Sequence, residues 1–332
     1  MIRRALLLAV LAGCPHHERT IEPQKRDAGS HLLPPDDALV ALPPAPPLPA
    51  VPEGLPPIDI PPAITPNAVA LGELLFAEPR LASDGKTTCA SCHDPAHGFA
   101  GGRLPTATGQ PNLRAAQPLV DLAWATSFGW DGRYATLAEQ LGAHVRGQLG
   151  RDLADGVAAL GSSPVYRAQF ARAGGATPDT ALAALSAYVL TRYAGAAWDA
   201  LERATPPPEL DAGYKLFTGK AQCAVCHPPP LYTDLGFHRL GLIALHDEGR
   251  GRVDPAQAGA FATPTLRGAA ARPSFFHDAS ARSLDAAIDW HLAGGTGQGA
   301  DPSIIDPALR RVALSPIERA QLGAFVRALA AR

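Results

Sequence analysis

Residues 89–93 and 223–227 both have the pattern C-x-x-C-H. This spacing is the attachment signature of a c-type haem, because the two thiols can add to the two vinyl groups of the porphyrin. The adjoining histidine is then held below the iron as an axial ligand. A redox dithiol or half of a zinc site also uses C-x-x-C, but neither explains a histidine after both pairs. The sequence therefore predicts two covalently bound haems, with attachment thiols and iron ligands at Cys89, Cys92, His93, Cys223, Cys226 and His227.

The methionine content limits the second axial ligand of each haem. Met1 is the only methionine in the chain. Methionine opposite histidine raises the reduction potential of a cytochrome haem. Because the chain has no methionine after its first residue, we expect neither haem to have that ligation. The second ligands must come from histidine, tyrosine, lysine or another donor, and histidine or tyrosine predicts lower potentials.

The fifth cysteine, Cys14, ends the sequence L-A-G-C after a basic start and a short apolar run. This order is typical of a bacterial lipoprotein signal peptide, residues 1–14, whose cleavage leaves Cys14 as the lipidated first residue. An ordinary signal peptide with a nearby free thiol is the alternative. Either case predicts a location in the periplasm, and lipidation predicts anchoring to a bacterial membrane.

The bulk composition excludes several classes of protein. A net charge of −2 provides no basic surface for nucleic acid. No stretch beyond the N-terminus is apolar enough to span a bilayer. The length of 332 residues, 46% of them hydrophobic, is sufficient for two compact cores.

The elements that must position the two motifs are mostly predicted helices. Similar apolar helices precede both motifs, at residues 72–76 and 213–217, which predicts an internal duplication. We therefore predict a mainly α fold of two cytochrome c-like domains, residues 65–205 and 206–332, after a proline-rich tether at 15–64. Capping signals predict helix starts after Thr65, Thr136, Thr177, Ser283 and Ser315.

In both its haem motifs and the short words that follow each of them, the chain resembles the bacterial di-haem cytochrome c peroxidases, a family that includes the enzyme that matures methylamine dehydrogenase. The similarity runs from about residue 66 to residue 329. It is carried by the words W-D-G-R at 130–133, E-Q at 139–140, D-x-G-R at 247–250, P-T-L-R at 264–267 and F-F-H-D at 275–278. The resemblance implies that the first haem is the peroxide site and that the second receives electrons from a donor protein. It also implies that Trp130 lies between the haems as a bridge.

The resemblance places the far ligand of the second haem on the helix after the F-F-H-D word. The matching residue is His291. His238 and His246 are the fallback ligands. The resemblance implies that His277 lies beside this haem without binding its iron.

On the far side of the first haem, the chain departs from the family. No histidine occurs between Phe99 and Trp124, where many relatives carry one that closes the iron. The family glutamate that moves a proton between peroxide oxygens falls near Gly150, and Asp152 is two residues away. Gln140 matches a family glutamine. His144 stands where the family has a proline, and it could transfer the proton, bind the iron, or be a surface residue.

The family also binds calcium between its haems. Its asparagine ligand matches Ala116 or Gln117 here, and Asn112 is a possible substitute. The loop that donates backbone carbonyls matches residues 272–274, where an arginine replaces the usual threonine. Backbone carbonyls do not depend on the side chain, so calcium stays open.

These expectations favour an enzyme that reduces hydrogen peroxide to water with electrons from a small c-type cytochrome or a cupredoxin. One alternative is an oxidase that modifies a partner protein, as the maturation enzyme does. The other is an electron carrier without peroxidase activity, with His144 and His291 as second ligands of the two irons. The resemblance also allows a homodimer.

Overall fold

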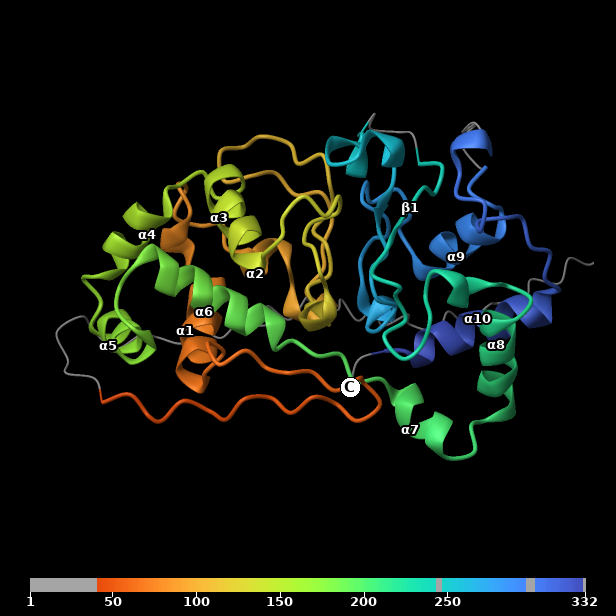
Figure 1. Cartoon of the computed structure of the whole chain (residues 1–332), viewed down its shortest axis with the longest axis horizontal. Coiled ribbons are helices and arrows are strands. Elements are labelled where there is room, and N and C mark those ends of the chain that lie inside the picture. The colour runs from red at the N-terminus through yellow and green to blue at the C-terminus, as the bar shows by residue number, and fades with distance from the viewer. Residues whose placement is uncertain (1–40, 243–246, 297–301, 331–332) are drawn as a thin grey trace, which may run out of the picture. The chain divides into compact units, whose positions relative to one another are not determined.

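The computed structural model describes residues 41–242, 247–296 and 302–330 (Figure 1). The predicted signal peptide with Cys14, the first part of the predicted tether and the fallback ligand His246 lie outside the described residues. None of the helices in the described ranges is long and apolar enough to cross a membrane.

The first half is a group of helices around one apolar core. The helices are α1 (Pro66–Phe76), α2 (Cys89–Cys92), α3 (Leu137–Gly147), α4 (Leu153–Leu160), α5 (Pro164–Ala173) and α6 (Pro178–Leu190). α1 crosses α6 at Gly72, where an added Cβ would lie only 2.0 Å from the carbonyl oxygen of Ala184. Leu71, Leu75 and Leu185 belong to the core around this crossing and have almost no exposure. Only glycine allows the two helices to approach this closely.

The second half repeats this packing with different helices. It contains α7 (Ala197–Arg203), α8 (Pro208–Thr218), α9 (Leu284–Leu292), α10 (Pro316–Ala328) and two short strands, β1 (Phe237–His238) and β2 (Phe261–Ala262). α8 lies against α10 at Gly213, where a Cβ would be 2.2 Å from the carbonyl oxygen of Gln321. In both halves, the helix before the C-x-x-C-H motif therefore crosses a later helix at a glycine.

Outside the α-helices, the ordered backbone is mostly short turns. β1 and β2 pair antiparallel, with Phe237 opposite Ala262. Short 3-10 turns occupy Pro79–Leu81, Pro95–His97, Leu122–Trp124, Cys223–Val225, Gly249–Arg252, Pro255–Gln257, Ala269–Ala271 and Pro302–Ile304. The described residues are therefore mainly helical, as predicted.

The capping signals in the sequence mark the real helix starts. Thr65, Thr136, Thr177, Ser283 and Ser315 are all N-cap residues whose side chains accept a backbone N–H. The caps of α3 and α10 are full capping boxes, in which the side chains of Glu139 and Glu318 accept from the N–H of the cap residue.

The described part of the proline-rich segment, residues 41–64, has no helix or strand and contacts the helices (Figure 1). The Arg172 guanidinium of α5 donates to the carbonyls of Leu42 and Pro43 at 2.6 and 2.7 Å. Arg203 of α7 pairs with Glu53 at 3.0 Å. These residues are docked on the body, and the role of residues 15–64 as a tether stays a prediction.

The core of the second half begins before the predicted domain boundary. Ala196 and Trp198 pack with Phe217, Tyr232 and Phe325. The Trp198 and Phe325 rings meet edge to face at 4.9 Å. The second core thus reaches back into the range predicted for the first domain, 65–205, and that boundary remains a prediction.

Two candidate haem sites

The first C-x-x-C-H motif lies in a cavity that is partly open to solvent. Cys89, Cys92 and His93 line it. The Nδ1 atom of His93 lies 2.9 Å from the Gln117 carbonyl oxygen and 3.1 Å from that of Phe99. Carbonyls only accept hydrogen bonds, so Nδ1 carries the proton and Nε2 keeps the lone pair that a metal needs.

A second imidazole, His144 of α3, lines the same cavity. Its Nδ1 atom lies 3.1 Å from the Gln140 carbonyl oxygen, which again leaves the lone pair on Nε2. Burial, and the positive charge that His144 would carry, lower the pKa of His93 to about 4. Burial also lowers the pKa of His144. Both rings are therefore neutral at pH 7, and each has one free lone pair.

The second cavity has the same chemistry. It is also partly open to solvent, and it is lined by Cys223, Cys226, His227 and His291. The Nδ1 atom of His227 lies 2.9 Å from the Tyr232 carbonyl oxygen. Its Nε2 lone pair is therefore also available to a metal.

His291 of α9 is held in the same way as His227. Its Nδ1 atom lies 2.8 Å from the Ala287 carbonyl oxygen, so its Nε2 lone pair is free. Burial and the neighbouring His291 lower the pKa of His227 to about 4, and burial lowers that of His291. Each cavity thus brings together two neutral histidines from distant parts of the chain.

The residues present fit a c-type haem in both cavities. All four cysteines of the motifs are free of disulfides. Burial raises the pKa of the Cys89 and Cys223 thiols to about 12, so these positions favour an uncharged sulfur such as that of a thioether. A thiol pair, a histidine with a free Nε2 and a largely apolar wall are what covalent haem attachment requires.

Trp130 lines both cavities and is 8% exposed. Its indole Nε1–H donates to the Ala115 carbonyl at 2.8 Å, and its own carbonyl accepts from the Ala262 N–H of β2 at 2.8 Å. The ring is therefore fixed at its nitrogen and at its backbone. One residue thus contributes to the walls of both cavities.

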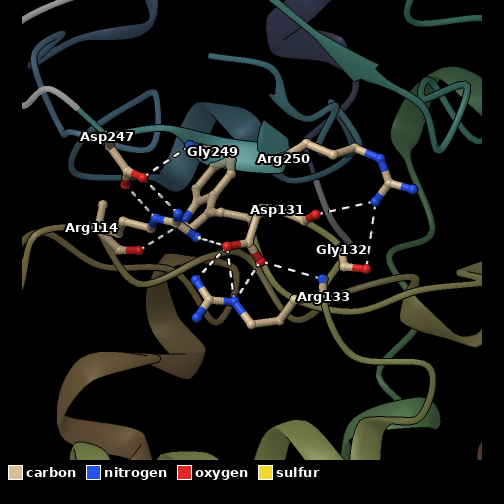
Figure 2. Close-up of polar contacts among 9 residues, drawn as sticks. Arg114, Asp131, Gly132, Arg133, Asp247, Gly249 and Arg250 are labelled. Atoms are coloured by element: carbon tan, nitrogen blue, oxygen red, sulfur yellow. Dashed lines mark hydrogen bonds and ion pairs between the residues drawn. The ribbon is translucent and has the colours of Figure 1, made fainter. Parts of the chain in front are cut away.

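A network of arginines and carboxylates is centred on Asp131, the residue after Trp130 (Figure 2). Arg114 donates to Asp131 at 2.8 Å and to both oxygens of Asp247 at 2.5 and 2.8 Å. Arg133 also binds Asp131. From the other side, Arg250 donates to the Asp131 carbonyl at 3.1 Å. These contacts join the W-D-G-R word of the first half to the D-x-G-R word of the second.

The other predicted residues of the first cavity have defined positions. Gln140 lines the cavity, and its carbonyl orients His144. Asp152, the carboxylate nearest to the missing glutamate, caps α4 by accepting from the Ala154 N–H at 2.8 Å. Gly150 has a positive φ of 64°. His97 is exposed and pairs with Asp94 at 2.7 Å, so it is a surface residue.

The fallback ligand His238 is bound to two carboxylates at its two ring nitrogens. His238 holds Asp306 with Nδ1 at 2.5 Å and Asp234 with Nε2 at 2.7 Å. The hydrogen bond to Asp234, with further bonds to Cys226 and Asp306, raises the pKa of His238 to about 11. Both ring nitrogens are protonated in that state, so no lone pair is left for iron. His277 instead stacks on Phe261, with ring centroids 3.5 Å apart.

The candidate calcium residues make contacts through side-chain nitrogens, which are not calcium ligands, so calcium stays a prediction. The Asn112 side-chain amide donates to the Leu104 carbonyl at 2.6 Å. Arg272 is buried and donates to the carbonyls of Thr265 and Arg267. Sequence reasoning missed Arg114 and Arg272 as parts of the sites. For Arg272, the sequence contains one signal, which is an arginine at a position where the family has a threonine.

Comparisons with known proteins agree with this chemistry. A family model described as di-haem cytochrome c peroxidase matches residues 66–204. The methylamine utilization protein MauG of Methylorubrum extorquens is 35% identical over 287 residues, covering 81% of this chain and 79% of that protein. The cytochrome-c peroxidase IdrP1 of Denitromonas iodatirespirans is 32% identical over 336 residues, covering 87% and 86%.

Solved structures give the same fold. A MauG-like protein associated with microbial copper homeostasis superposes with a TM-score of 0.74 at 24% identity, over 84% of this chain and 94% of that one. The diheme peroxidase BthA of Burkholderia thailandensis gives a TM-score of 0.67 at 22% identity, over 80% and 86%. The chain therefore belongs to the di-haem cytochrome c peroxidase family, as an oxidoreductase whose family membership implies two c-type haems.

Proposed function

We propose that this protein reduces hydrogen peroxide to water in the first cavity, with electrons from a small c-type cytochrome or cupredoxin that enter at the second. The observation that carries the proposal is that one residue, Trp130, lines both cavities. Electron transfer between two sites is favoured when one rigid aromatic ring spans the protein between them. Reduction of one peroxide consumes two electrons and two protons and yields two waters.

The proposed ligands and attachment residues follow from the two cavities. Cys89 and Cys92 would hold the first haem, with His93 as iron ligand. A bound haem supplies the redox-active iron of each site. The second haem would be held by Cys223 and Cys226, with its iron between two histidines, His227 and His291. Ligation by two histidines favours a lower potential than ligation by histidine and methionine.

His144 is the proposed acid–base residue of the first cavity. Its neutral ring has a free Nε2 lone pair at pH 7, which can take a proton from one peroxide oxygen and return it to the other. The Gln140 carbonyl holds the ring by its Nδ1–H, so Gln140 positions this base through its backbone. Asp152 does not compete for the role, because it caps α4.

The test is low-temperature EPR and peroxide consumption of the holoprotein with one electron added per molecule. We expect a high-spin ferric signal in the wild type. We expect His144→Ala to keep that signal and to slow peroxide consumption by roughly 10²–10⁴-fold, the usual contribution of acid–base catalysis. His97→Ala is the matched control, since His97 is an exposed histidine bound to Asp94. The proposal fails if wild-type protein consumes no peroxide in any redox state.

The same spectra test the electron-carrier alternative. It is favoured by the presence of both His93 and His144, each with a free Nε2, in one cavity. If His144 binds iron, the half-reduced wild type gives only a low-spin ferric signal, and His144→Ala produces the high-spin one.

A second candidate function is oxidation of side chains in a partner protein. The similarity to MauG and a histidine at position 291 favour it, because a second haem of low potential stabilises oxidised iron. Mass spectrometry of co-expressed neighbouring proteins, with and without this chain, distinguishes the two functions. A peroxide-dependent covalent change would establish the second candidate.

We also propose that Cys14 anchors the protein in a bacterial membrane facing the periplasm. The support is the L-A-G-C sequence after a basic start and an apolar run. Cys14→Ser should move the protein from the membrane fraction to the soluble periplasmic fraction. A homodimer remains an expectation from the family resemblance.

A further inference from the structure

Arg272 is a buried cation in the wall of the second cavity. It follows the 3-10 turn Ala269–Ala271 and is only 8% exposed. The neighbouring Arg267 is also buried, but its guanidinium pairs with both oxygens of Asp199 at 2.7 and 2.8 Å. Among the described residues, Arg272 has no such carboxylate partner. Two neighbouring buried arginines are thus compensated very differently.

The hydrogen bonds of Arg272 fix its position without neutralising its charge. Its Nη2 donates to the carbonyls of Thr265 and Arg267 at 2.7 and 2.9 Å. Its Nε is buried and has no hydrogen-bond partner in the described part of the chain. Burial lowers the pKa of Arg272 to about 10, so the group remains charged at pH 7. A buried charge that no carboxylate contacts is destabilising, so this arrangement favours binding of an anion.

The charged groups around Arg272 do not supply that anion. Asp306 lines the same cavity, but it accepts from His238 and from the Ala308 N–H. Asp121 acts on Arg272 only through space, and its Oδ1 accepts from the Ala194 N–H at 2.9 Å. Two other groups in the cavity wall, His238 and Arg310, are themselves cations. The counter-charge must therefore come with whatever fills the cavity.

We propose that Arg272 binds a propionate carboxylate of the haem attached at Cys223 and Cys226. A c-type haem carries two propionates and is the group that these thiols would hold in this cavity. A guanidinium matches a carboxylate in shape and charge, and the free Nε–H is available to donate to it. The proposal rests on the presence of the second haem and is independent of the peroxide chemistry in the first cavity.

The expected consequence is a higher reduction potential of the second haem. Reduction adds one electron to the site, and a fixed positive charge nearby favours the reduced state. Without Arg272, the propionate would remain as a buried anion and would disfavour the added electron. The guanidinium therefore offsets part of the lowering that ligation by two histidines causes.

The experiment is a spectroelectrochemical titration of the holoprotein that resolves the two haems. For Arg272→Gln, we expect the equilibrium constant for one-electron reduction of the second haem to fall at least about tenfold, or about 59 mV, with the first haem unchanged. Arg272→Lys should keep more than half of the wild-type equilibrium constant for one-electron reduction of the second haem. Arg310→Gln is the matched control, because Arg310 lines the same cavity but is exposed and bonded to Gln222.

Three results would overturn the proposal. The first is an unchanged potential in Arg272→Gln, and the second is an equal shift in Arg310→Gln. The third is a wild-type potential that depends on chloride or phosphate, with the dependence lost in Arg272→Gln, since a free anion would then be the partner. If Arg272→Gln does not fold, a crystal structure of the wild-type holoprotein decides, and a propionate outside hydrogen-bonding distance of the guanidinium refutes the assignment. The titration measures a reduction potential and not peroxide turnover. This proposal can therefore fail while the proposed function holds, and the reverse.

Discussion

Replacing Arg114 by glutamine should destabilise the protein more than any other single change around Trp130. Arg114 is 17% exposed and binds two carboxylates, Asp131 and Asp247, which are 1% and 2% exposed (Figure 2). The two aspartates lie in different halves of the chain. Glutamine retains a polar side chain but removes the charge, so two buried carboxylates lose their shared cation.

The magnitude follows from Asp247. Burial alone would raise its pKa, but hydrogen bonds from Arg114 and from the Gly249 N–H, with the charge of Arg114, lower it from 3.8 to about 2. This difference of about 1.8 pKa units corresponds to about 2.4 kcal/mol of stability at pH 7. Removing the cation also leaves the carboxylate buried without a partner. We therefore expect Arg114→Gln to cost about 3–5 kcal/mol.

The loss should depend on pH in a defined direction. A carboxyl group whose pKa is lowered on folding stabilises the protein above its unfolded pKa of about 3.9. That stabilisation disappears as the pH falls through the folded pKa of about 2. The difference in the free energy of unfolding between wild type and Arg114→Gln should thus be larger at pH 7 than at pH 3.

The assay is urea unfolding of the holoprotein, followed by far-ultraviolet circular dichroism at pH 7 and pH 3. Arg133→Gln is the control, since Arg133 also binds Asp131 but is 35% exposed and leaves Asp247 paired. We expect this control to lose about 1 kcal/mol or less. The reasoning is refuted if Arg114→Gln loses less than about 1 kcal/mol at pH 7, or if its loss grows as the pH falls.

Three further predictions concern the sites themselves. Trp130→Phe should slow electron transfer between the haems at least about tenfold, measured by stopped-flow reduction, while the lost Nε1–H bond to Ala115 costs only about 1 kcal/mol of stability in urea; an unchanged transfer rate would remove Trp130 from the path. His291→Met should raise the reduction potential of the second haem in a spectroelectrochemical titration, because methionine favours reduced iron; a lower potential would show that His291 is not its ligand. Calcium removal with EGTA should leave both haem spectra unchanged, since the buried positive charge of Arg272, in the loop that would supply carbonyl ligands, disfavours a second cation there; a spectral change reversed by added calcium would contradict this.

Local signals in the sequence predicted the local structure well. Helix starts at Thr136 and Ser315 followed from capping boxes, in which a cap residue and a glutamate three positions later satisfy each other's backbone groups. The C-x-x-C-H motifs likewise identified four cysteines and two histidines that line the cavities. Such signals need only a few consecutive residues, so a single sequence contains them.

Contacts between distant residues were not predictable in this way. Arg114 and Asp247 are separated by 133 positions, and neither belongs to a pattern that indicates a partner. The sequence allows His238 as a ligand, and only the fold shows that Asp234 and Asp306 occupy its two nitrogens. An arginine at position 272 is visible in the sequence, but its lack of a carboxylate partner among the described residues depends on the packing of the second core.

The two cavities share their main chemistry, so any division of labour must come from their differences. Each has a thiol pair, two neutral histidines and Trp130 in its wall. The arginine that joins the halves beside the first cavity, Arg114, is neutralised by buried aspartates. Arg272, in the wall of the second cavity, has no carboxylate bound to it among the described residues. If both proposals hold, Arg272 bound to a haem propionate would favour an added electron at the second site, and His144 would serve as the free base of the first.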